Sequence, residues 1–279
     1  MIDGTTKLIG HIGYPTESFK SPMIYNPYFE KRGINAVVVP MGCKEEDYDA
    51  FLKHVFRLSN MHGALITMPH KIATLRLVDE ASVSARIAGA CNAVRIDQRG
   101  MLIGDMFDGE GFVRGILKKG RILAGAKALV CGCGGVGSAI AASLAKAGVA
   151  ELGLFDAFPR LMSELSERLH THHPDLHVRL GSADPEGYDF VVNATPLGMK
   201  EGDPLPMDVE RIAPSTFVGE VVMKEEITPF LAAVRAKGCD YQIGTDMLFE
   251  QIPAYIEFFG FGATTSDELR EVAQIHYVS

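Results

Sequence analysis

The feature that most constrains the fold of this chain is a glycine-rich turn near its middle, at residues 132–137, which reads G-C-G-G-V-G. The apolar run K-A-L-V-C at 127–131 precedes it and is typical of a buried strand. The alanine-rich stretch 138–147 follows it and is typical of a helix. The next apolar run ends in an acid, Asp156, about 20 residues further on, where a dinucleotide-binding fold places its ribose ligand. This order predicts a Rossmann-type dinucleotide-binding unit.

Each residue of the turn has a physical reason to be there. Gly132 permits the tight turn, Gly134 lets the backbone approach a pyrophosphate, and Gly137 allows close packing of the helix on the strand. Gly135 and Val136 complete the turn, and the helix that follows would present free N–H groups and the positive end of its dipole to the phosphates. The same pattern could be a turn that binds nothing, but in this context we interpret it as a dinucleotide site.

Asp156 also indicates which dinucleotide is bound. A carboxylate at this position accepts hydrogen bonds from the 2′-hydroxyl of the adenosine ribose and repels a 2′-phosphate. The next two residues, Ala157 and Phe158, offer no cationic group, although Arg160 could in principle reach the site. The sequence therefore predicts NAD as the cofactor, with NADP disfavoured.

The composition excludes several other classes of protein. The 279 residues carry a formal net charge of −8, which argues against an extended surface for nucleic acid or anionic membranes. No apolar run approaches the roughly 20 residues that span a bilayer, and the N-terminus has no signal-peptide pattern. The 5 cysteines are unevenly spaced, and Cys131 and Cys133 lack further ligands at metal-binding spacing. We expect a cytoplasmic protein with a small-molecule substrate and no metal, nucleic-acid or membrane partner.

The rest of the chain alternates strand-like and helix-like patterns, which predicts an α/β protein. The N-terminal part has strand patterns at 7–13, 35–41, 63–69 and 91–97, separated by helical patterns at 21–32, 45–59, 70–79 and 82–88. This alternation predicts a largely parallel sheet. A second series of strands and helices runs to about residue 240, and a helical pattern follows from Asp246, with Pro253 as an expected distortion. We predict one domain from residues 1–105 plus 241–279 and a second, the Rossmann domain, from residues 106–240.

Several segments, in the same order along the chain, together resemble the shikimate and quinate dehydrogenase family. They are K-S-P (20–22), T-M-P-H-K (67–71), G-A-C-N-A-V (89–94), D-G-E-G-F (108–112), the glycine turn, N-A-T-P-L-G-M (193–199), T-P-F-L (228–231) and M-L followed by Gln251. The resemblance implies an N-terminal α/β domain that holds the substrate and the catalytic residues, a Rossmann-type dinucleotide-binding domain, and a cleft between them. It also implies reversible oxidation of a ring hydroxyl of shikimate, quinate or a related cyclic hydroxy acid.

The resemblance further implies that Lys71 and Asp108 handle the proton. Reduction of a ketone leaves an alkoxide that needs a proton, and the reverse reaction needs a base on the alcohol. A lysine held by a carboxylate can serve in both directions, and the sequence leaves open which of the two transfers the proton. Taken singly, Lys71 could be a surface lysine after a turn and Asp108 a helix cap.

The remaining site residues are also implied by the resemblance. Ser21 directly before Pro22 is, on local grounds, also a good helix N-cap. The predicted substrate ligands are Ser21, Thr67, Asn92 and Gln251. The predicted cofactor ligands beyond the glycine turn and Asp156 are Asn193, Ala194, Thr195, Gly244 and Met247.

The chain departs from the family pattern at positions around the expected substrate. Phe19, Leu65, Met106 and Met223 stand where the family usually has polar residues, and we expect Phe19 and Met223 to contact the substrate. Asp156 begins the triplet that replaces the family's N-R-T, which agrees with NAD. We therefore hypothesise that the chemistry is retained and that the substrate is altered or poorly matched to shikimate.

Two alternative functions stay open from the sequence. The chain could be an NADP-dependent biosynthetic shikimate dehydrogenase, or a dinucleotide-binding sensor on the same fold with little turnover. The role of one segment also stays open. The apolar segment 254–262 could be the contact of a homodimer or the end of a helix packed in the core.

Overall fold

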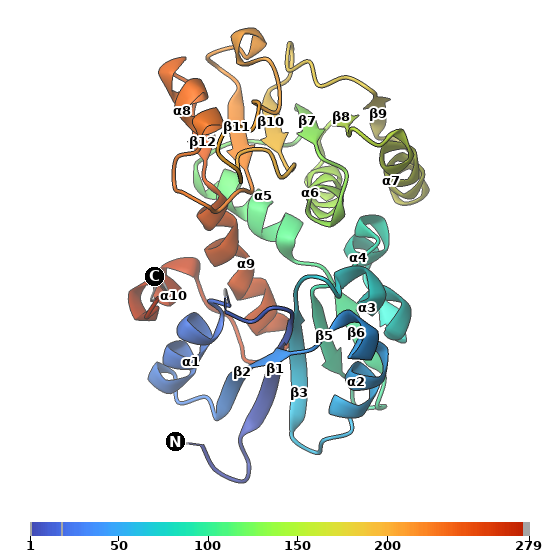
Figure 1. Cartoon of the computed structure of the whole chain (residues 1–279), viewed down its shortest axis with the longest axis vertical. Helices are drawn as coiled ribbons and strands as arrows, with labels where there is room; N and C mark the ends of the chain where they lie inside the picture. The colour runs from blue at the N-terminus through green and yellow to red at the C-terminus, as the bar shows by residue number, and fades with distance from the viewer. Residues whose placement is uncertain (1, 18, 276–279) are drawn as a thin grey trace. The chain divides into compact units, whose positions relative to one another are not determined.

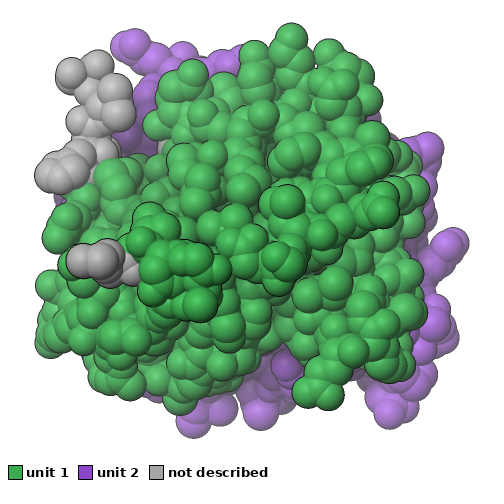
Figure 2. Space-filling model, turned by 90° about the horizontal axis from the view of Figure 1, so that it is seen from below, with its two compact units in different colours: residues 1–107, 252–279 green, residues 108–251 purple. Residues whose placement is uncertain are grey.

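The computed structural model describes residues 2–17 and 19–275. Contacts between α-carbons divide the chain into two compact units: unit 1 consists of residues 1–107 and 252–279, and unit 2 of residues 108–251 (Figure 2). Among the described residues, no helix is long and apolar enough to cross a membrane.

Unit 1 is built around a six-stranded sheet with the order β2-β1-β3-β5-β6-β4 (Figure 1). Its elements are β1 (Lys7–Gly13), α1 (Pro22–Lys31), β2 (Ala36–Gly42), the 3₁₀ turn η1 (Glu45–Asp47), α2 (Tyr48–Val55), β3 (Met61–Ile66), α3 (Lys71–Leu77), β4 (Glu80–Ala81), α4 (Val83–Ala88), β5 (Ala93–Ile96), β6 (Leu102–Asp105) and α10 (Ser266–Val272). The apolar face of the amphipathic helix α2 packs in a core with Ile12, Ile66 and Val94.

The sheet of unit 1 is largely parallel, as predicted, but it contains one antiparallel strand, β5. Strands β1, β2 and β3 are parallel, but β5 runs antiparallel to both β3 and β6. The reason lies in the short connection between β5 and β6, because a tight turn can join only antiparallel neighbours. Asp97 accepts backbone hydrogen bonds from Arg99 and Met101, and Gly100 adopts a positive φ of 81° to close this turn.

Unit 2 is a parallel sheet with the order β12-β11-β10-β7-β8-β9. Counted along the chain from β7, this is the strand order 3-2-1-4-5-6 of the Rossmann fold, so the predicted fold class is confirmed. Its elements are α5 (Asp108–Lys118), β7 (Lys127–Cys131), α6 (Gly135–Lys146), β8 (Glu151–Phe155), α7 (Pro159–His172), β9 (His177–Leu180), β10 (Phe190–Asn193), the 3₁₀ turn η2 (Val209–Arg211), β11 (Phe217–Glu220), α8 (Pro229–Ala236), β12 (Tyr241–Gln242) and α9 (Gly244–Phe258), whose last residues belong to unit 1.

The central strands of unit 2 are buried along their length, as expected of parallel strands covered on both faces. Helix α8 begins where the sequence favours a helix start: the side chain of Thr228 accepts a hydrogen bond from the backbone N–H of Leu231, and Pro229 occupies the first turn. The strand order places the carboxyl ends of β7, β10 and β11 beside one another, at the edge where open α/β sheets bind ligands.

Helix α5 is absent from the sequence prediction, and its glycines explain why. Gly109, Gly111 and Gly115 lower helix propensity, but each lies against a neighbouring segment of unit 2. A β-carbon at Gly111 would lie 2.7 Å from the carbonyl oxygen of Met247, and one at Gly115 would strike Gln242. The glycines therefore allow close packing of α5, and that contact is invisible to local sequence patterns.

The apolar segment 254–262 lies mainly in the core of unit 1. Tyr255 and Phe259 are almost fully buried, and the ring of Tyr255 packs edge-on against Phe107 with the ring centroids 4.8 Å apart. This burial favours the core-packing alternative for these residues over a dimer contact.

Candidate active site

The glycine turn has the geometry of a phosphate cradle. Gly132 has a φ of +100°, which favours glycine, and a β-carbon there would lie 2.6 Å from the carbonyl carbon of Ala194. A β-carbon at Gly137 would strike the carbonyl oxygen of Gly132. By contrast, β-carbons at Gly134 and Gly135 would meet nothing within 4 Å, so open space lies beside the first turn of α6. Free N–H groups facing open space at a helix N-terminus suit a pyrophosphate.

Asp156 lies directly after β8 and is fixed beside this turn. One carboxylate oxygen accepts a hydrogen bond from the backbone N–H of Cys133 (2.7 Å), and the other from that of Phe158 (2.9 Å). The ring of Phe158 is 69% exposed, and Arg160 pairs with Glu164 one turn along α7, with 3.1 Å between Nε and Oε1. The carboxylate is thus held where the sequence analysis expects a ribose ligand.

A third segment, the turn 193–198 after β10, completes this group. The side-chain oxygen of Asn193 accepts hydrogen bonds from the backbone N–H (3.1 Å) and the hydroxyl (2.7 Å) of Thr195. Its side-chain nitrogen donates to the carbonyl of Leu197 (3.1 Å) and to Glu220 Oε1 (2.7 Å). Because Ala194 lies against Gly132, the structure brings the predicted residues Asn193, Ala194 and Thr195 together with the glycine turn.

The predicted residues near the start of α9 lie close to the end of β11. A β-carbon at Gly244 would lie 2.9 Å from the carbonyl carbon of Val222 and 3.0 Å from Cγ of Met223. The side chain of Met223 is 48% exposed and Met247 is buried. The side-chain oxygen of Gln251 is shielded from solvent and has no hydrogen-bond partner in the described part of the chain. An orphaned acceptor of this kind is a candidate ligand for a substrate hydroxyl.

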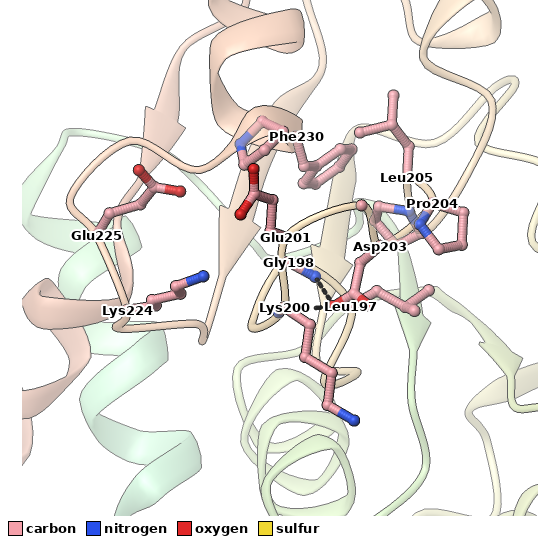
Figure 3. Close-up of a pocket in the computed structure, with 13 residues that line it drawn as sticks. Leu197, Gly198, Lys200, Glu201, Asp203, Pro204, Leu205, Lys224, Glu225 and Phe230 are labelled. Carbon is pink, nitrogen blue, oxygen red and sulfur yellow. Dashed lines mark hydrogen bonds between the residues drawn. The ribbon is translucent and has the colours of Figure 1, made fainter.

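A cavity of about 480 Å³ opens beyond the turn 193–198, between the loops 197–206 and 224–230 (Figure 3). Asp203 fixes the first loop by accepting hydrogen bonds from the backbone N–H groups of Gly198 (3.0 Å) and Lys200 (2.9 Å). Charged side chains of both signs, including Lys224 and Glu201, lie at its edge.

In unit 1, the predicted substrate residues Phe19 and Thr67 lie together where β1 and β3 end. A β-carbon at Gly13 would strike Cγ2 of Thr67 and would lie 2.9 Å from Cζ of Phe19. Ser21 stands just before α1, and its predicted capping role is wrong: its backbone is helical and its side chain makes no cap hydrogen bond. Pro22 does occupy the first turn of the helix. The Ser21 hydroxyl is therefore not used by the helix N-terminus.

The structure adds His11, which the sequence analysis missed because it lies inside an apolar strand pattern. Its ring stacks on Phe19 with centroids 3.9 Å apart and an angle of 20°. Its Nδ1 is shielded from solvent and has no partner among the described residues. Burial, reinforced by the positive charge of Lys71, lowers the pKa of His11 to about 4. A neutral imidazole and a phenyl ring thus form a flat wall at this end of the sheet.

Within unit 1, the segment 91–92 forms hydrogen bonds with Lys71 and with Phe107. Lys71, half-buried, begins α3, and its carbonyl accepts a hydrogen bond from the backbone N–H of Cys91 (2.9 Å). The side-chain oxygen of Asn92 accepts one from the backbone N–H of Phe107 (2.9 Å), which directly precedes Asp108. Asn92 is fully buried and Asp108 is 4% exposed. The pairing of the Lys71 and Asp108 side chains stays a prediction.

The residue before Lys71 is held rigidly. The Nε2 of His70 lies 2.8 Å from the carbonyl oxygen of Cys43, and its ring stacks on Tyr48 with centroids 3.8 Å apart. Tyr48 in turn shares a hydrogen bond with Thr74 on α3 (2.6 Å). These contacts fix the N-terminus of α3, and with it the backbone of Lys71.

The four apolar replacements do not share one environment. Leu65 is 4% exposed and Met106 is 2% exposed, so both are core residues of unit 1. Phe19 is half-buried and Met223 is largely exposed. Of the four, only Phe19 and Met223 keep surface that a ligand could contact without rearrangement.

Comparison with known proteins adds independent findings. Residues 11–94 match the family model described as the shikimate dehydrogenase substrate binding domain. The chain is 37% identical, over 90% of its length and 89% of the relative's, to shikimate dehydrogenase (NADP(+)) of Rubrobacter xylanophilus. Shikimate 5-dehydrogenase of Listeria monocytogenes, solved with shikimate and NAD, is similar with a TM-score of 0.89 and 28% identity over 97% of each chain. Quinate dehydrogenase of Corynebacterium glutamicum, solved with NAD, gives a TM-score of 0.86 and 28% identity over 96% of this chain and 98% of that one.

Proposed function

The chain belongs to the shikimate dehydrogenase family, and we propose that it is an NAD-dependent dehydrogenase that reversibly oxidises a ring hydroxyl of shikimate, quinate or a related cyclic hydroxy acid. A nicotinamide dinucleotide and a small-molecule substrate follow from the family and from the fold. The preference for NAD and the choice of acid are the finer parts of the proposal. The observation that carries the NAD preference is the placement of Asp156 beside the glycine turn.

The names of the relatives favour NADP, and the chemistry of this chain favours NAD. The Rubrobacter relative is named for NADP(+). In this chain, however, the carboxylate of Asp156 lies at the end of β8, flanked by Ala157 and the exposed ring of Phe158. A 2′-phosphate there would meet a negative charge, whereas a 2′-hydroxyl would donate to it. Two of the structural neighbours were solved with NAD, so the fold accommodates that cofactor.

When bound, the nicotinamide ring supplies or accepts the hydride. The chain's own residues would do the rest. Gly134 and Gly135, with the N-terminus of α6, would hold the pyrophosphate, and Asp156 the ribose. Lys71 and Asp108 would give a proton to the new alkoxide, or take one from the alcohol in the other direction. General acid–base catalysis of this kind contributes about 10²–10⁴-fold to a rate.

Phe19 supports a substrate that differs from shikimate. It stands where the family usually has a serine, and its ring is stacked on a neutral histidine rather than facing a polar partner. Each hydrogen bond lost to a substrate weakens binding by about 0.5–1.5 kcal/mol. We therefore expect this chain to turn over shikimate weakly, and to prefer a ring acid with fewer or rearranged hydroxyls.

The proposal is tested by a steady-state assay that follows NADH or NADPH formation from shikimate and from quinate, each with NAD and with NADP. We expect turnover with NAD to exceed that with NADP, and kcat/KM for shikimate to be low. Efficient turnover of shikimate with NADP would instead establish a biosynthetic shikimate dehydrogenase, the alternative that the Rubrobacter relative's name favours.

A further inference from the structure

A buried carboxylate in unit 2 has no role in the reaction proposed above. Glu220 is the last residue of β11 and is fully buried. Its two oxygens accept hydrogen bonds from two side chains: Oε1 from Asn193 (2.7 Å) and Oε2 from the hydroxyl of Thr228. No cationic side chain pairs with it among the described residues. A carboxylate that is buried without a cationic partner is stable in the folded protein only if its hydrogen bonds offset the free-energy cost of its desolvation.

Burial raises the pKa of Glu220, and the hydrogen bonds from Thr228 and Asn193 act in the opposite direction. Hydrogen bonds to a charged acceptor are about twice as strong as those between neutral groups. Glu220 therefore needs the hydrogen bonds from both Asn193 and Thr228 to offset its burial, and it fixes both of these side chains in return.

Each donor controls the conformation of a different segment. Asn193 organises the turn 193–198 through its bonds to Thr195 and Leu197. Thr228 caps α8 by accepting from the backbone N–H of Leu231 (3.2 Å), and it ends the loop that follows β11. Through its hydrogen bonds with Asn193 and Thr228, the buried carboxylate of Glu220 thus connects the two loops that line the cavity in Figure 3.

The turn 193–198 lies at the switch point of the sheet, between β7 and β10, where the strand order reverses. In this fold the half that begins with β7 holds one mononucleotide and the half that begins with β10 holds the other. Asp156 marks the β7 half as the adenosine side. The turn organised by Asn193 therefore belongs to the nicotinamide side.

We propose that Glu220 is a positioning residue that sets the turn 193–198, through Asn193 and Thr228, for the nicotinamide half of the dinucleotide. This inference rests on the dinucleotide site of the proposed function. It predicts that Glu220 affects binding of the whole dinucleotide and leaves unchanged the binding of a fragment that lacks the nicotinamide ring.

The test is calorimetric titration of wild type and Glu220 variants with NADH, with NADPH and with ADP-ribose, which lacks the nicotinamide. For Glu220→Ala we expect the preferred reduced dinucleotide to bind about tenfold or more weakly, because two buried donors lose their acceptor. ADP-ribose should bind within about twofold of wild type, since the glycine turn and Asp156 are untouched. Glu220→Gln, which keeps the size and one acceptor, should restore most of the affinity.

Glu220→Asp provides a milder variant if Glu220→Ala does not fold. It keeps the charge but is one methylene shorter, so it cannot reach both Asn193 and Thr228, and the same selective loss is expected. Glu210→Ala, which removes an exposed glutamate from the same unit, is the matched control and should bind all three ligands as wild type does. Equal weakening of ADP-ribose and the dinucleotide, or unchanged dinucleotide binding, would overturn the inference. Failure of wild type to bind NADH and NADPH would overturn the proposed function itself.

Discussion

The two units of this chain build their candidate sites from different materials. In unit 2 the site is made mostly of backbone: a positive-φ glycine, a helix N-terminus facing open space, and a turn held by Asn193. In unit 1 it is made of side chains on strand ends and at the start of α3, among them Phe19, His11 and Lys71. A backbone site constrains the sequence strictly, because only glycine fits at its close contacts. A side-chain site can change its ligand with one replacement, and Phe19 is such a replacement.

The largest effect is expected for the proton transfer, which we assign to Lys71 and Asp108. Lys71→Ala should lower kcat by about 10³-fold if Lys71 handles the proton. Cofactor affinity should stay unchanged, because the cofactor residues lie in unit 2. Single-turnover kinetics and calorimetry measure the two quantities, with Lys53→Ala, an exposed lysine of α2, as the control. Full activity in Lys71→Ala would remove this residue from the mechanism.

We propose Asp156 as the side chain that selects the cofactor of the backbone-built site. Asp156→Ala should shift the ratio of kcat/KM for NAD over that for NADP by about 100-fold toward NADP, since a charge-assisted hydrogen bond contributes about 1.5–3 kcal/mol. Asp175→Ala, an exposed acid of the same unit, should leave the ratio unchanged. An unaltered ratio in Asp156→Ala would show that another residue selects the cofactor.

His11 makes the side-chain-built unit sensitive to acid. Its folded-state pKa of about 4 lies below the usual histidine value of 6.5, so the unfolded chain takes up a proton first as the pH falls. The stability that neutral His11 contributes is present above pH 6.5 and is lost toward pH 4. Between pH 7.5 and 5, wild type should lose about 2 kcal/mol more unfolding free energy than His11→Leu.

Urea unfolding of both proteins at the two pH values measures this difference, and the other titrating groups cancel in the comparison. Equal losses in wild type and His11→Leu would mean that His11 does not titrate as its burial indicates.

The smallest effect is expected at Phe19, where we propose that one replacement has changed the substrate preference of the side-chain-built site. Phe19→Ser should raise kcat/KM for shikimate by about tenfold, because it restores one hydroxyl and removes an apolar wall. Phe158→Ser, at an exposed ring in unit 2, should not raise it. A fall in shikimate turnover in Phe19→Ser would show that the ring contributes to binding this acid.

What the sequence could predict follows the same division. The glycine turn, the strand before it and Asp156 lie where the pattern places them, because glycine requirements and strand burial are local properties. The antiparallel pairing of β5, the helix α5 and the missing cap hydrogen bond of Ser21 were not predictable in this way. The first two depend on contacts with distant segments, namely the pairing partners of β5 and the packing of Gly111 against α9. The third depends on the helical backbone that Ser21 adopts.

Two polar residues show the same limit most clearly. His11 and Glu220 both sit in strands whose patterns are read as simple core. Their importance comes from partners outside their own strands, Phe19 for His11 and Asn193 and Thr228 for Glu220. A charged or titratable residue inside an apolar strand is the only signal that local sequence offers for such a network.

The most direct test of the central claim is calorimetric titration of the unmodified protein with NAD⁺ and with NADP⁺ at one ionic strength. We predict that NAD⁺ binds at least about tenfold more tightly, since Asp156 would accept a hydrogen bond from the 2′-hydroxyl and would repel a 2′-phosphate. Tighter binding of NADP⁺ would contradict it and would place this chain with relatives such as that of Rubrobacter xylanophilus in cofactor use.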